Sequence, residues 1–98
     1  MQINAIHNNT ILTLALEGRL DNLTSLELKT TLENSLEGVD SLVLDFSKVD
    51  YVSSAGLRTL LSVHKQMSVR DGMKVMNVNE GVMEIFQLTG FVNALSIE

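Results

Sequence analysis

The chain has 98 residues, of which 45% are hydrophobic and 19% are charged, and its formal net charge is −5 at pH 7. This length suits one small domain, and the hydrophobic share is far above that of disordered segments. Seven Lys and Arg residues do not suffice for an extensive basic patch in an acidic chain, so nucleic acid is not expected as a partner. The chain contains no cysteine, which excludes disulfides and thiolate metal sites.

Residues 3–18 predict a β-hairpin. Two β-prone segments flank His7-Asn8-Asn9, and the paired asparagines tolerate turn conformations. In the second segment Leu12, Leu14 and Leu16 alternate with smaller residues, which is the period of a strand with one buried face. Gly18 is expected to end this strand.

A helix is predicted from Asp21 to Leu36, because its leucines recur every four residues. Thr24 and Glu27 have the spacing of a capping box, and Gly38 follows as a stop signal. The next segment, "SLVLDF", is a compact apolar run that predicts a strand near the centre of the sheet.

The second half of the chain continues the alternation of helix and strand. One side of a second helix is expected to be lined by Leu57, Leu60, Leu61, His64 and Met67, and Gly72 follows its end. "MKVMNV" predicts another core strand. Val82, Ile85 and Phe86 indicate a short amphipathic helix closed by Gly90, and "NALSIE" is expected to supply a last edge strand.

Strands that alternate with helices predict an α/β fold in a single domain over residues 1–98. The sheet is expected to be mixed, because the N-terminal hairpin adds antiparallel pairing to largely parallel strands, and helices should pack on it. Functional sites in such sheets gather at the carboxyl ends of strands.

The stretch "YVSSAGL", Tyr51 to Leu57, lies at such a strand end. Either Ser53 or Ser54 is expected to cap the next helix, at a value of roughly 1 kcal/mol. An exposed serine hydroxyl there lies beside the positive end of the helix dipole, where an added phosphate is well tolerated. The two roles are compatible. Ala55 and Gly56 are small and are expected to leave the backbone open to a partner.

Three motifs together resemble a STAS domain of the anti-sigma factor antagonist type. They are "GRLD" at Gly18 to Asp21, "LVLDFSKVDYVSSAGLRTLL" from Leu42 to Leu61, and "LTGF" at Leu88 to Phe91. The resemblance spans nearly the whole chain in the expected order. It implies helices packed on a mixed sheet and a function as a partner-switching protein in signal transduction.

Such an antagonist, when unphosphorylated, binds an anti-sigma factor that is also a serine kinase, and so releases a sigma factor for transcription. Phosphorylation by that kinase turns the antagonist off. The resemblance therefore implies a kinase substrate rather than an enzyme, with no cofactor, and a phosphoserine phosphatase as a further partner.

The family's Asp-Ser-(Ser/Thr/Ala)-Gly run falls on residues 53–56, so the resemblance makes Ser54 the candidate phosphoacceptor. The preceding position, often Asp in the family, is Ser53 here, and its hydroxyl is the alternative acceptor. Asp21 matches an acidic residue in the loop near the acceptor. The expected partner-binding surface consists of Asp21, Ser53, Ser54, Ala55, Gly56 and Leu57.

Other functions have weaker support in the sequence. A serine hydrolase would carry glycine two positions before Ser54, where this chain has Val52. His7 and His64 lack a set of ligand partners, so structural roles are favoured and no catalytic residue or metal site is predicted.

Two other roles stay open within the resemblance: an accessory subunit that docks on the ATPase of an ABC transporter without obligatory phosphorylation, and a subunit of a larger stress-signalling assembly. A neighbouring gene for an anti-sigma factor or for a transporter ATPase would discriminate between switching and docking.

The N-terminal segment lacks the charged region and unbroken apolar core of a signal peptide. No apolar run approaches the roughly 20 residues of a membrane span. The sequence therefore predicts a soluble cytoplasmic protein that does not bind membranes.

Overall fold

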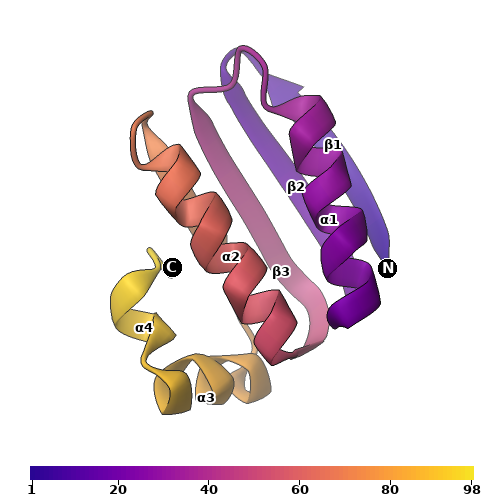
Figure 1. The fold of residues 1–98 in the computed structure, drawn as a ribbon, viewed down its shortest axis with the longest axis vertical. Helices are drawn as coiled ribbons and strands as arrows, with labels where there is room; N and C mark the ends of the chain where they lie inside the picture. The colour runs from indigo at the N-terminus through magenta and orange to yellow at the C-terminus, as the bar shows by residue number, and fades with distance from the viewer.

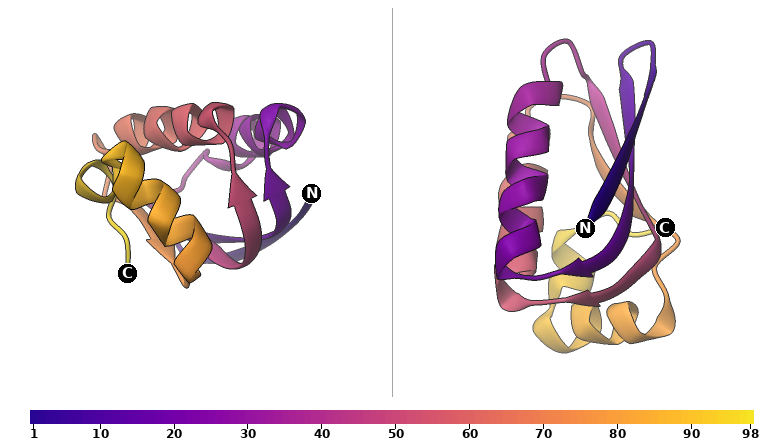
Figure 2. Two further views of the ribbon diagram at one scale, coloured as in Figure 1. Left: turned by 90° about the horizontal axis from the view of Figure 1, so that it is seen from below. Right: turned by 90° about the vertical axis from the view of Figure 1, so that its right-hand side faces the viewer.

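The computed structural model covers residues 1–98. Its four strands form one sheet in the order β1-β2-β3-β4, in which only the β1–β2 pair is antiparallel. Helices α1 and α2 cover one face of the sheet; α3 lies at the end at which α2 begins, and α4 lies on the side of α2 away from α1 (Figures 1 and 2). The predicted α/β class and mixed sheet are confirmed. The elements are β1 (Gln2–Asn8), β2 (Ile11–Leu20), α1 (Asn22–Ser35), β3 (Ser41–Val52), α2 (Ser54–Met67), β4 (Gly72–Met76), α3 (Glu80–Thr89) and α4 (Phe91–Ala94).

The predicted hairpin is confirmed, but its second strand is longer than expected. Asn9 turns the chain with a φ of 57°, and Asn8 pairs with Ile11. Gly18 does not end β2, which continues to Leu20. The pairing of β2 with β3 instead shifts register directly after Gly18, whose φ is 112°. A glycine with positive φ accommodates such an irregularity within a strand, so the prediction of a stop was wrong.

Helix α1 begins with a different capping box from the predicted one. Asp21 Oδ1 accepts hydrogen bonds from the backbone N–H groups of Leu23 and Thr24, at 3.1 and 3.0 Å. Thr24 Oγ1 in return accepts from the Asp21 N–H at 2.8 Å. The box therefore joins Asp21 to Thr24, not Thr24 to Glu27, because the helix starts three residues earlier than that pairing requires. Glu27 instead lies 3.6 Å from the amino group of Met1.

The core lies between the sheet and its helices. The segment predicted as a central strand is confirmed as part of β3, and Phe46 from it packs against Phe86 of α3 with ring centroids 6.3 Å apart. In α2 the predicted Leu57, Leu60 and Met67 are buried. Leu61 and His64 are only partly buried, and Val63, which the prediction omitted, is buried. The buried stripe of α2 thus passes through Val63.

The C-terminal segment confirms one prediction and corrects another. Helix α3 ends at Gly90, whose φ of 78° is that of a left-handed cap. The predicted last strand is only a single bridge between Val75 and Ile97, because residues before Leu95 turn into α4. None of the four helices is long and apolar enough to cross a membrane.

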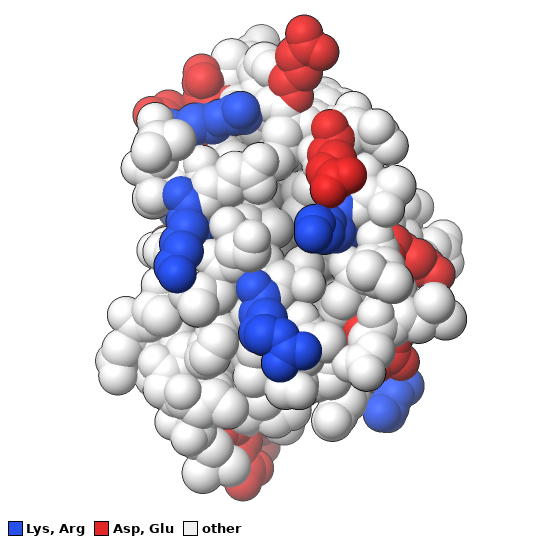
Figure 3. Space-filling model, in the orientation of Figure 1, with Lys and Arg blue, Asp and Glu red and all other residues white.

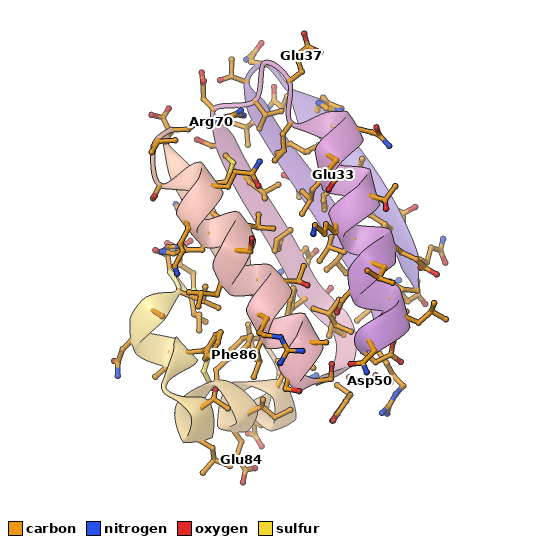
Figure 4. The ribbon with its side chains drawn as sticks, in the orientation of Figure 1. Glu33, Glu37, Asp50, Arg70, Glu84 and Phe86 are labelled. Atoms are coloured by element: carbon orange, nitrogen blue, oxygen red, sulfur yellow. The ribbon has the colours of Figure 1, made fainter.

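One arginine joins the two loops at the end of the sheet opposite α3. Arg70, labelled in Figure 4, follows α2, and its Nη1 donates to the carbonyls of Leu36 and Val39, both at 2.7 Å. These carbonyls belong to the connection between α1 and β3. The Leu36 carbonyl also accepts the Val39 N–H at 3.1 Å, so the guanidinium adds a second donor at the C-cap of α1 and a donor for the Val39 carbonyl that follows it.

Replacing Arg70 with Met should lower the free energy of unfolding by about 2 kcal/mol, since hydrogen bonds from a charged donor are lost. Urea unfolding followed by circular dichroism measures the effect. Lys65→Met is the matched control, because Lys65 is exposed and its side chain makes no hydrogen bond or ion pair. Equal midpoints for the two variants would contradict the assigned role of Arg70.

Candidate functional site

The candidate site lies where β2 and β3 end and α1 and α2 begin. Leu20 and Val52 are paired in register at the ends of these parallel strands. The Ser53 N–H donates to the Leu20 carbonyl at 2.8 Å, which extends the strand pairing into the turn. Asp21 and Ser53 consequently lie at the same edge of the sheet, as helix starts that lie side by side in Figures 1 and 2.

The two adjacent serines have different roles in the structure. Ser53 is the N-cap of α2, and its Oγ accepts a hydrogen bond from the Gly56 N–H at 3.2 Å. Ser54 is the first helical residue, it is exposed, and its hydroxyl has no partner within the chain. The capping function therefore falls on Ser53 and leaves the Ser54 hydroxyl free.

Gly56 brings the first turn of α2 against the strand ends. A Cβ at this position would lie 2.8 Å from the Leu20 carbonyl oxygen and 3.0 Å from side-chain carbons of Leu20 and Val52. Real Cβ contacts are not this short, so only glycine fits without a shift. The sequence suggested that Gly56 opens the backbone to a partner, whereas in the fold it faces inward.

The predicted partner-binding residues divide into two groups. Asp21, Ser53 and Ala55 are partly exposed and Ser54 is exposed, so these side chains reach the surface. Gly56 and Leu57 are buried and support the surface from beneath. The predicted residues are therefore brought together, but only four of them are accessible to a partner.

Asp21 carries a fixed negative charge at this edge. Its pKa is lowered below 3.8, first by the hydrogen bond from the Thr24 N–H and then by that from the Thr24 hydroxyl, with smaller contributions from Leu23 and the Arg19 charge. The carboxylate is thus ionised at neutral pH and engaged in capping α1. It shapes the surface by holding the helix start in place.

A cation–π pair that the sequence did not predict lies beside the site. The Arg19 guanidinium lies 4.3 Å from the centroid of the Tyr51 ring. The two residues are paired between β2 and β3, and only the strand register reveals that they meet. No group of three His, Cys, Asp or Glu side chains is arranged to hold a metal ion.

The geometry of the fold and site agrees with a known family. The sequence model of the STAS domain family matches residues 2–98. The chain belongs to the STAS domain family. The resemblance inferred from its motifs is thereby confirmed.

Individual relatives support the assignment to the STAS family. The chain is 32% identical over 84 residues to the putative anti-sigma factor antagonist BtrV of Bordetella bronchiseptica, covering 84% of this chain and 72% of that protein. It resembles the crystal structure of a putative anti-sigma factor antagonist from Thermotoga maritima with a TM-score of 0.88 and 18% identity, over 97% and 84% of the two chains. The phosphorylated form of the Bacillus cell fate determinant SpoIIAA gives 0.75 and 14%, over 99% and 91%. The last two likenesses show a shared fold.

The Gly56→Ala variant should lose about 1–3 kcal/mol of unfolding free energy, because the Leu20 backbone must move to admit a methyl group. Gly81→Ala is the control: its Cβ would lie 3.5 Å from Asn79 Oδ1, and the helical position should gain up to about 1 kcal/mol. Thermal or urea unfolding compares the two. Equal stabilisation of this STAS domain by both substitutions would refute the packing role of Gly56.

Asp21 should make the stability of the folded chain fall as the pH is lowered in the acidic range. A carboxyl whose pKa is lower in the folded state than in the unfolded state stabilises the folded state at pH values above its unfolded-state pKa, which is near 3.8. This contribution is lost as the pH falls through the lower pKa of the folded state. The melting-temperature advantage of the wild type over Asp21→Asn should therefore shrink below pH 3.8. Asp50→Asn, at the same edge (Figure 4), controls for the loss of one charge. An advantage that stays constant down to pH 2 would contradict this assignment.

Proposed function

We propose that this STAS domain is an anti-sigma factor antagonist that is switched by phosphorylation of Ser54. Unphosphorylated, it binds an anti-sigma factor with serine kinase activity and so releases a sigma factor. The phosphorylated form does not bind, and a phosphoserine phosphatase restores the active state. The observation that carries the proposal is the exposed, unpartnered hydroxyl of Ser54 at the start of α2.

The structure favours Ser54 over Ser53 as the acceptor. Ser53 Oγ already accepts from the Gly56 N–H, so a phosphoryl group there would disturb the cap. At Ser54 the phosphate would lie beside backbone N–H groups that the helix leaves unpaired, at the positive end of its dipole. The chain would therefore tolerate the modification without refolding.

The effect of the phosphate would fall on the partner. A phosphoserine adds about −1.5 to −2 charges and bulk at neutral pH. It would do so beside Asp21 and Ala55, which are partly exposed at the starts of α1 and α2. A loss of a few kcal/mol of binding free energy changes affinity by orders of magnitude. The switch needs only local repulsion and steric conflict.

The surroundings of Ser54 favour a substrate rather than a catalyst. A serine nucleophile needs a base within hydrogen-bond reach, and Ser54 Oγ has no such partner. His64, on the same helix, lies roughly 15 Å further along its axis. The names of the relatives agree with a regulatory role: BtrV is described as a putative anti-sigma factor antagonist, and SpoIIAA has been solved in a phosphorylated form.

Tandem mass spectrometry of the protein isolated from its own host should detect an added mass of about 80 Da on Ser54. Its occupancy should change between growth and stress conditions. Ser53→Ala should lose about 1 kcal/mol of stability with its cap but remain phosphorylated, whereas Ser54→Ala should abolish the modification.

Pull-down from host lysate then tests the consequence for binding. Ser54→Ala should retain the anti-sigma factor under all conditions, and Ser54→Asp should bind it weakly. Equal binding by both variants would refute the switch. Absence of phosphate in every condition, with a transporter ATPase as the retained protein, would instead support the docking role.

A further inference from the structure

A groove of about 370 Å³ separates the outward faces of α1 and α2. Leu32 and Val63 are the buried apolar residues among those that line it, and most of the others are polar. Figure 3 views the molecule from this side and shows basic side chains over both helices. The polar lining includes Ser25 and Lys29 of α1 and Arg58, Thr59, Ser62 and Gln66 of α2.

The charge of the groove is opposite to that of the chain. The molecule carries −5, but the ionisable residues of the groove are Lys29, Arg58 and a single acid, Glu33. Neither Lys29 nor Arg58 forms an ion pair, since the two in the structure involve other residues. Glu33 lies one turn beyond Lys29, away from the helix starts (Figure 4). Among its lining residues, the end of the groove nearest the candidate site is therefore basic. The start of α2 adds positive partial charge there, and the Asp21 carboxylate that caps α1 at the same edge offsets part of it.

A second, independent feature points to a ligand. Ser25 is 4% exposed, lines the groove, and its hydroxyl has no hydrogen-bond partner. A buried hydroxyl without a partner costs free energy. An acceptor group that enters the groove would relieve this cost.

We propose that the groove binds an acidic peptide segment of the protein partner. Lys29 and Arg58 would pair with its carboxylates, while hydroxyls and the Gln66 amide would hydrogen-bond its backbone. The groove follows α2 from Ala55 to Gln66, roughly 16 Å at the helical rise, which matches about five residues of extended peptide. The identity of the partner rests on the proposed function; the binding of an acidic segment does not.

The groove is coupled to Ser54 through Arg58. The two residues are four positions apart on α2, so their side chains lie on the same face of the helix. A phosphate on Ser54 would attract the Arg58 guanidinium and withdraw it from the groove. Phosphorylation would thus weaken the hold on the acidic segment as well as repelling the partner directly.

Nuclear magnetic resonance titration of the ¹⁵N-labelled chain tests the groove directly. The probe is a blocked pentaglutamate peptide, with pentaglutamine as its neutral match. Pentaglutamate should shift the amides of Ser25, Lys29, Arg58 and Ser62, less so at high salt. Lys29→Gln and Arg58→Gln should each weaken binding by about threefold or more, whereas Lys65→Gln, outside the groove, should not. Phosphoserine installed at position 54 should weaken binding by a larger factor in the wild type than in Arg58→Gln, where only direct repulsion between the phosphate and the peptide remains.

Two outcomes would overturn the inference. Shifts that centre on basic residues elsewhere, such as Arg70 or Lys74, would mean that the peptide is attracted without using the groove. Inorganic phosphate that binds the groove as tightly as pentaglutamate would identify a small-anion site instead. Because the titration needs no kinase, its failure leaves the Ser54 switch standing, and absence of phosphorylation in the host leaves the titration result intact.

Discussion

The close approach of α2 to the ends of β2 and β3 is the constraint on which the site depends. The Ser53 N–H binds the Leu20 carbonyl at 2.8 Å, and Gly56 leaves no space for a Cβ between the helix and Leu20. A larger residue would push the helix start away from the strands. Ser53 would then lose its position as a cap, and the orientation of Ser54 would no longer be fixed. A buried glycine thus determines what the surface presents.

The paired serines follow from the needs of a helix start. The first turn of a helix leaves backbone N–H groups unpaired, and one side-chain acceptor is enough to bind one of them. Ser53 provides that acceptor, so the hydroxyl of Ser54 is not needed for folding. At α1 the same need is met by Asp21, which keeps a permanent charge. One helix start is therefore fixed in charge, and its neighbour is free to be modified.

Local periodicity was sufficient to predict β1 to β4, α1 to α3 and the fold class, because alternating leucines and capping glycines act over a few residues, but it did not predict α4. The other errors fall at boundaries. Whether Gly18 ends a strand or bends it depends on pairing with β3, and the extent of the last strand depends on β4. The motif indicated a candidate site, but two adjacent serines are equivalent in sequence. The long-range contact between Ser53 and Leu20 separates their roles, and strand register brings Arg19 to Tyr51.

The acidic character of the chain limits how a phosphate could act as a signal. An addition of about −2 to a molecule that already carries −5 changes its overall field only moderately, and salt screens that field beyond roughly 10 Å. A phosphate on Ser54 would therefore act mainly on groups of the partner that lie close to it. The basic end of the groove, with Arg58 one helical turn away, is the part of this surface whose local charge a phosphate would cancel. A partner that relies on that basic end would respond sharply to one modification, although the rest of the molecule stays unchanged.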